Sequence, residues 1–189
     1  MKRLLALLLL MLAWPAAAVT LDGAVFDEAS QVGSAALVLN GAGIRTRFFF
    51  KIYAIGLYLP AKQDNAAAVL GQPGAKRIRI AMLRDLSAEK LASALIEGIR
   101  NNNSAAELAP LQARIDDLKN ALLELKEVTK GTVITLDSVP GSGTHLAVSG
   151  QARERVIPGE DFYPALLRIW LGEHPVAADL KGALLGSAR

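Results

Sequence analysis

The stretch that decides the fold is LNGAGIRTRFFFKIYAIGLYLP, Leu39–Pro60. β-Branched and aromatic residues dominate it, and these residue types favour strands. Asn40-Gly41 and Gly43 are turn signals at one end, and Pro60 ends the strand at the other. We therefore predict one long, largely buried strand, or two strands joined at a bend. The three consecutive phenylalanines, Phe48–Phe50, are expected to lie in the core.

The flanking sequence predicts an α+β fold in which a large antiparallel sheet is covered by helices on one side. Alternating or β-rich segments indicate strands, and apolar residues at helical spacing indicate helices. Ser87 is expected to cap one helix, and Ser104 with Glu107 has the spacing of a capping box. The leucine pattern after Ser104 resembles a coiled coil, but a helix packed on its own domain is the preferred interpretation. Strands are expected within 19–27, 35–39, 77–82, 132–136 and 144–149, and helices within 61–75, 87–100, 104–125, 161–171 and 177–185.

The N-terminus has the pattern of a secretory signal peptide. Lys2-Arg3 forms a basic region, Leu4–Leu12 is apolar, and Ala16–Ala18 supplies small residues for cleavage. Residues 1–18 are therefore predicted to be a cleaved signal, which leaves 19–189 as a single domain without a stable membrane span. The alternative is a retained membrane anchor. The predicted location is outside the cytoplasm, in the periplasm if the source is a Gram-negative bacterium.

Composition argues against several classes of function. Removing Lys2 and Arg3 lowers Lys+Arg from 21 to 19 against 18 acidic residues, so the net charge falls from +3 to +1. This balance does not favour a nucleic-acid partner. The chain has no cysteine, which excludes a thiol nucleophile and thiolate metal ligands. Of its two histidines, His145 lies in a predicted strand with no neighbouring acid or second ligand, and His174 lies in a loop between Gly172 and Pro175, so we expect neither a metal site nor another cofactor.

The candidate binding residues lie in the opening stretch. Alternation along one strand would place Arg45, Arg47, Lys51 and Tyr53 on the same face, with apolar residues further along. A ligand with an acidic head and an apolar body would match this face, although the two arginines could also simply reach solvent. Arg45 and Tyr53 are eight residues apart, or roughly 26 Å on a straight strand. Both could contact a compact ligand only if the strand bends.

A resemblance to a known family is carried by residues 39–45, 51–59, 139–144 and 165–172, with Pro175, Leu180 and Leu184–Gly186. These segments resemble the chalcone isomerase family, and most closely its bacterial exported members, called chalcone isomerase-like. The resemblance implies an open-faced β-sandwich: a large antiparallel sheet with a layer of helices and a ligand cleft between them. It covers nearly the whole mature chain in order.

The family includes plant enzymes that cyclise chalcones to flavanones and non-catalytic relatives that bind fatty acids. The resemblance implies that Arg45 faces the ligand and that Tyr53 takes the place of a catalytic threonine. The other polar residues of the enzymes match Ser87, Ala94 and Ile169 in this chain. Because alanine and isoleucine side chains cannot donate hydrogen bonds, the donor set that the cyclisation needs is largely missing.

The first hypothesis is therefore an exported, non-catalytic protein that binds a fatty-acid-like or other apolar anionic ligand through Arg45 and Tyr53. We assign no catalytic residue, cofactor or metal. One alternative is an intramolecular lyase or isomerase of chalcone isomerase type with an unknown substrate. Another is a structural or partner-docking protein whose cleft is filled by side chains. The oligomeric state is left open.

Overall fold

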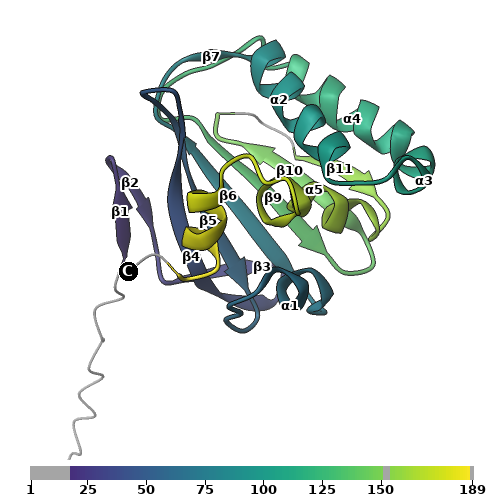
Figure 1. Ribbon diagram of the computed structural model, residues 1–189, viewed down its shortest axis with the longest axis horizontal. Helices are drawn as coiled ribbons and strands as arrows, with labels where there is room; N and C mark the ends of the chain where they lie inside the picture. The colour runs from purple at the N-terminus through teal and green to yellow at the C-terminus, as the bar shows by residue number, and fades with distance from the viewer. Residues whose placement is uncertain (1–17, 151–153, 188–189) are drawn as a thin grey trace, which may run out of the picture.

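A seven-stranded antiparallel sheet forms the centre of the molecule, which is described by a computed structural model over residues 18–150 and 154–187 (Figure 1). The predicted signal peptide, apart from Ala18, lies outside the described residues. The order of strands across the sheet is β11-β10-β9-β6-β5-β4-β3. Their bounds are β3 Ala29–Val32, β4 Ala35–Arg47, β5 Phe50–Leu59, β6 Lys76–Met82, β9 Val133–Val139, β10 Gly143–Val148 and β11 Arg155–Pro158.

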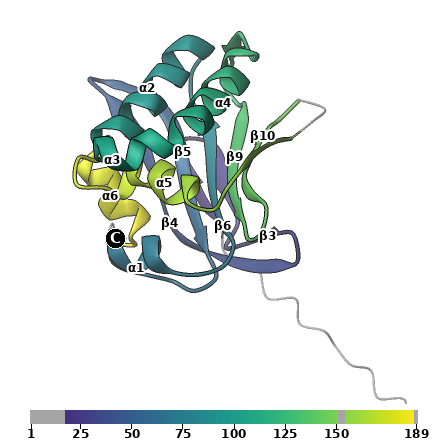
Figure 2. The same ribbon diagram turned by 90° about the vertical axis from the view of Figure 1, so that its right-hand side faces the viewer.

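Helices cover one face of this sheet, as predicted (Figure 2). The main core lies between the two layers, where Trp170 and Leu166 on α5 are fully buried together with sheet residues such as Ile80 and Leu136. The caps predicted at Ser87 and at Ser104 with Glu107 are both present. The helices are α1 Ala66–Gly71, α2 Ala88–Asn101, α3 Ala105–Leu108, a 3₁₀ turn Ala109–Leu111, α4 Gln112–Leu123, α5 Phe162–Leu171 and α6 Ala178–Leu184.

Two short strand pairs complete the fold. β1 (Val19–Leu21) pairs with β2 (Ala24–Phe26), and β7 (Leu86–Ser87) pairs with β8 (Glu127–Val128) beside the start of α2. The β1–β2 pair lies against the sheet face opposite the helices, where Phe26 is fully buried next to Gly56. That face is thus only partly covered, which is the open-faced arrangement expected from the resemblance.

The stretch 39–60 forms two strands rather than one. β4 and β5 pair along their length and are joined by a two-residue turn at Phe48-Phe49. The prediction that the three phenylalanines are core residues is wrong: Phe48 is 81%, Phe49 97% and Phe50 60% exposed. Their hydrophobicity indicated burial, but the chain reverses at this point and carries them out beyond the sheet.

The glycines at the start of the stretch do not form the predicted turn. Gly41 and Gly43 lie inside β4, where α6 packs directly on the strand. A Cβ on Gly41 would lie 2.1 Å from the carbonyl oxygen of Ala183, and one on Gly43 would lie 2.8 Å from Leu180 Cδ1. The glycines are required by this close approach of helix and strand. Asn40 strengthens the contact, since its side-chain amide donates to the carbonyl of Leu184 at 2.7 Å.

Candidate functional site

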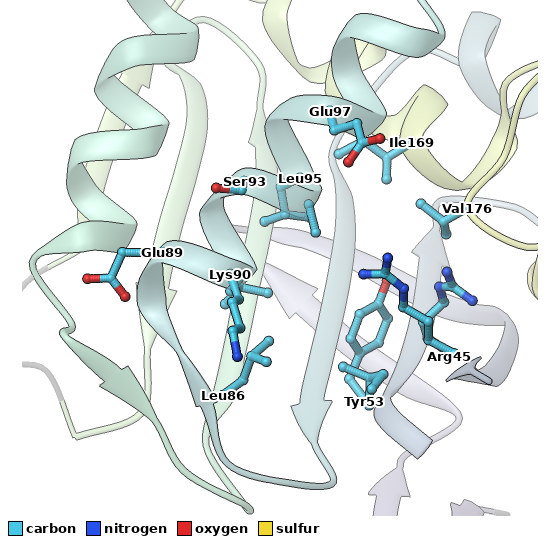
Figure 3. A pocket seen from close by; sticks show the side chains of 14 residues that line it. Arg45, Tyr53, Leu86, Glu89, Lys90, Ser93, Leu95, Glu97, Ile169 and Val176 are labelled. Carbon is cyan, nitrogen blue, oxygen red and sulfur yellow. The ribbon is translucent and has the colours of Figure 1, made fainter. Parts of the chain in front are cut away.

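A groove of about 390 Å³ lies between α2, the β4–β5 hairpin and the segment that precedes α6 (Figure 3). This volume lies within the usual range of small-molecule sites. Its floor contains buried apolar side chains, whereas its rim carries exposed charged residues of α2 and β4. The residues that line it are Arg45, Arg47, Ile52, Tyr53, Leu86, Glu89, Lys90, Leu91, Ser93, Ala94, Leu95, Glu97, Ile169 and Val176.

Arg45 and Tyr53 lie together in this groove. They are direct cross-strand partners in the β4–β5 pair, and Figure 3 shows Arg45 beside the Tyr53 ring. The long separation calculated for a straight strand therefore does not apply, because the chain turns back at Phe48-Phe49. A single compact head group can contact both side chains.

A bulge adjusts which side chains reach the groove. Arg45 pairs with Tyr53 and Thr46 pairs with Lys51, so Ile52 is an extra residue on β5. A bulge lets two consecutive side chains point to one region, and both Ile52 and Tyr53 line the groove. Lys51 is directed elsewhere and bonds Asp22 at 2.7 Å, so its predicted place on the same face as Arg45 is wrong.

The Tyr53 hydroxyl is held in place by Trp170. The indole Nε1–H of Trp170 donates to the hydroxyl oxygen at 3.0 Å, and both residues are buried. Because this bond uses the oxygen as acceptor, the hydroxyl hydrogen remains able to donate. Burial raises the pKa of Tyr53, although the Trp170 bond and the nearby charge of Arg45 partly oppose that shift. Tyr53 is therefore a neutral donor near neutral pH.

The groove has more positive than negative groups at its rim. Arg45, Arg47 and Lys90 contribute cations, and Glu89 and Glu97 contribute carboxylates. Across residues 18–150 and 154–187, none of the three cations forms a salt bridge. The guanidinium of Arg45 donates to the carbonyl of Thr46, which leaves further N–H groups for a ligand.

Two of the positions matched to enzyme residues also line the groove. Ala94 on α2 and Ile169 on α5 both contact it, but neither side chain can donate a hydrogen bond. Ser87, in contrast, accepts a bond from the backbone N–H of Lys90 and caps α2. The polar side chains that line the groove from the hairpin are thus Arg45, Arg47 and Tyr53, and Ser93 lines it from α2.

Sequence reasoning missed several parts of the site. Trp170 lies on the apolar face of α5, where its pattern indicated a core residue and gave no sign of the bond to Tyr53. Lys90 and Val176 were not singled out because they come from segments that meet the hairpin only in the folded chain. The signal that could have found this bond is the presence of Trp170 and Tyr53 in segments with apolar patterns. A buried indole N–H and a buried hydroxyl each need a hydrogen-bond partner.

The histidines do not belong to this groove. The expectation that His145 has no acidic neighbour is wrong: Glu154 Oε1 lies 3.1 Å from Nδ1, and Ser142 Oγ lies 2.7 Å from Nε2. His145 faces away from the helices, because the next residue, Leu146, belongs to the core beneath them. No group of three or more histidine, aspartate or glutamate residues that could hold a metal ion occurs within the described ranges.

The fold and groove define a chalcone isomerase-like protein with a candidate ligand site between sheet and helices. The family model described as chalcone isomerase-like matches residues 18–186, so the chain belongs to that family. A solved structure, that of a fatty-acid binding protein of Arabidopsis thaliana, is similar with a TM-score of 0.66 and 15% identity. The match covers 89% of this chain and 96% of the plant chain. No curated protein sequence matches the chain.

Proposed function

We propose that this protein binds a fatty acid, or another apolar molecule with an acidic head, without chemically changing it. The observation that carries the proposal is the pairing of Arg45 with Tyr53 in a groove whose floor is apolar. The fold similarity to a fatty-acid binding protein supports it.

The head group would be bound by a charge and a neutral donor together. The Arg45 guanidinium presents N–H groups to a carboxylate, and hydrogen bonds to charged groups contribute about 1.5–3 kcal/mol each. The Tyr53 hydroxyl adds a second donor from β5. The alkyl chain would lie on Ile52, Leu95 and Ile169, which remove it from water.

The two alternatives fit the groove less well. A lyase or isomerase must stabilise a developing enolate with several aimed donors, and Ala94 and Ile169 supply none. Turnover of a chalcone that disappears on replacing Arg45 or Tyr53 would establish the enzyme instead. A protein with a filled cleft would lack the cavity that lies beside Arg45.

The test compares dodecanoate with its methyl ester by titration calorimetry. Arg45→Ala is expected to weaken binding of the acid roughly 10- to 100-fold and to leave binding of the ester nearly unchanged. Lys51→Ala is the matched control, because it removes a cation that bonds Asp22 and does not line the groove. Equal binding of dodecanoate by the parent and Arg45→Ala would refute the site, and mass spectrometry of co-purifying molecules would identify the natural ligand.

We also propose that the chain is exported. Support comes from the basic, apolar and small-residue regions of residues 1–18. The described part of the chain includes no helix long and apolar enough to cross a membrane. N-terminal sequencing of the protein from cells should give Val19 as the first residue, and an intact Met1 would contradict cleavage.

A further inference from the structure

We propose that the turn between β4 and β5 docks this protein onto an anionic lipid bilayer. The turn and its flanks, Arg45–Lys51, are called the aromatic tip below. They read RTRFFFK and combine three phenylalanines with three cations and no acid, and one of these cations, Lys51, is paired with Asp22 at 2.7 Å. Figure 1 shows the turn projecting past the sheet at the end where β7 and the start of α2 lie.

The exposure of the tip is unusual for aromatic residues. Phe49 is 97% and Phe48 81% exposed, whereas Phe26 and Phe162 are fully buried. Outside the aromatic tip, the large hydrophobic side chains exposed within residues 18–150 and 154–187 are all valines, none more than 49% exposed. Aromatic side chains gathered at one exposed point are typical of interaction sites.

The tip has a strained backbone conformation. Phe48 has a φ of +55°, in the left-handed region, at the first central position of a two-residue hairpin turn. Glycine or asparagine is usual there, and a bulky residue is rare. Because the Phe48 ring is exposed, it gains little burial energy within the fold to offset this strain.

Cations surround the rings. Arg47 lies over the Phe48 ring at 5.7 Å, and Arg84 from the neighbouring loop lies over Phe50 at 4.7 Å. Neither arginine forms a salt bridge with a described residue. Asp85, the acid next to Arg84, accepts a bond from the backbone N–H of Lys130 at 2.7 Å.

This arrangement fits a bilayer better than a protein. Aromatic rings at a protruding tip can enter the boundary between head groups and acyl chains, and the flanking cations can contact lipid phosphates. A second copy of the chain would present the same cationic tip and be repelled. A protein partner would need a deep acidic pocket to receive both central rings.

Docking would also place the groove at the lipid surface. Arg47 lines the groove and is followed directly by Phe48, so the groove begins where the tip would enter the lipid. Docking would allow a fatty acid to pass from the bilayer into the groove, and this step rests on the proposed function, fatty-acid binding. Docking itself requires only the tip.

The experiment measures binding to vesicles of phosphatidylcholine containing about 30% phosphatidylglycerol, without added fatty acid, by flotation. Phe48→Asn with Phe49→Ser is expected to weaken binding on the order of 100-fold, about tenfold for each ring removed. Asparagine tolerates the positive φ of residue 48, so this variant should fold. Val25→Ser, which replaces an exposed apolar residue on β2, is the control and should bind like the parent.

A second measurement locates the tip directly. The fluorescence added by the substitution Phe49→Trp should be quenched by brominated lipid in the same vesicles, whereas that of the fully buried Trp170 should not. Vesicle binding that survives the double variant, or fluorescence from Phe49→Trp that lipid does not quench, would overturn the proposal. A parent that forms dimers abolished by the double variant, with no vesicle binding, would overturn it in favour of a second copy. Because Phe48 and Phe49 do not line the groove, dodecanoate binding should persist in the double variant, which keeps the two proposals separable.

Discussion

Replacing Gly41 with alanine should loosen the attachment of α6 to the sheet. The new Cβ would lie 2.1 Å from the carbonyl oxygen of Ala183 and 2.8 Å from that of Leu184. Both are backbone atoms, so relief requires the whole helix to move. Overpacking of this kind costs about 1–3 kcal/mol, and loss of the Asn40 bond to Leu184 adds about 1 kcal/mol. We expect the free energy of unfolding to fall by about 2–4 kcal/mol.

Complete release of α6 sets the upper limit of the effect. Leu180 and Leu184 are almost completely buried, and exposing each costs about 1.5–3 kcal/mol. With the Asn40 bond the limit is about 4–7 kcal/mol. Val176 lines the groove just before α6, so displacement of the helix should weaken dodecanoate binding as well.

Urea unfolding followed by circular dichroism measures the change in stability. Hydrogen exchange of residues 178–186 shows whether the loss is confined to α6. Gly182→Ala is the control, because its Cβ would meet nothing closer than Ser187 Cβ at 3.9 Å. Alanine inside this helix should stabilise the protein by about 0.5–1 kcal/mol. A Gly41→Ala protein within about 0.5 kcal/mol of the parent would show that helix and strand are not in the close contact described.

Two further substitutions test side-chain hydrogen bonds. Tyr53→Phe leaves the buried indole N–H of Trp170 without its acceptor, so we expect the free energy of unfolding, measured by urea titration, to fall by about 1–3 kcal/mol. An unchanged midpoint of unfolding would contradict that bond. Glu107 has a pKa of about 2, because the backbone N–H and hydroxyl of Ser104 and the Arg168 guanidinium donate to its carboxylate. Since the folded pKa lies below the ordinary value of 4.5, this carboxylate stabilises the fold above that pH and ceases to do so as pH falls towards 2. Glu107→Gln should flatten the stability profile in that window, and an equally steep profile in both proteins would count against these bonds.

Local signals in the sequence predicted most of the elements. The caps at Ser87 and Ser104 depend on a few neighbouring residues, and the strand within Lys76–Met82 depends on simple alternation. Such features are visible before folding because their causes lie within a few positions of the chain. The α+β class and the sheet with its helical layer follow from their order.

The errors have two other causes, a contact with a distant segment and a chain reversal without turn residues. Gly41 and Gly43 look like turn residues. They lie in a strand instead, where α6, from near the other end of the chain, packs too closely for any side chain. Whether Arg45 and Tyr53 lie close together depended on a bend that the sequence left open, because nothing around Phe48-Phe49 resembles a turn. Hydrophobicity favoured either one long buried strand or two strands joined at a bend, and no turn residue was present there to decide between them.

The absence of turn residues at Phe48-Phe49 is itself informative about the hairpin. Exposed rings at Phe48 and Phe49 add little to folding, and the left-handed backbone at Phe48 costs about 1–2 kcal/mol relative to a residue such as glycine. Asn-Gly at these positions would form the same reversal with less strain. A sequence shaped by stability alone would therefore not keep this turn, and contact with something outside the fold is the reason we infer for it. Because Arg45 and Arg47, which belong to the tip, also line the groove, the partner that the tip contacts would lie against the groove in which the ligand is proposed to bind.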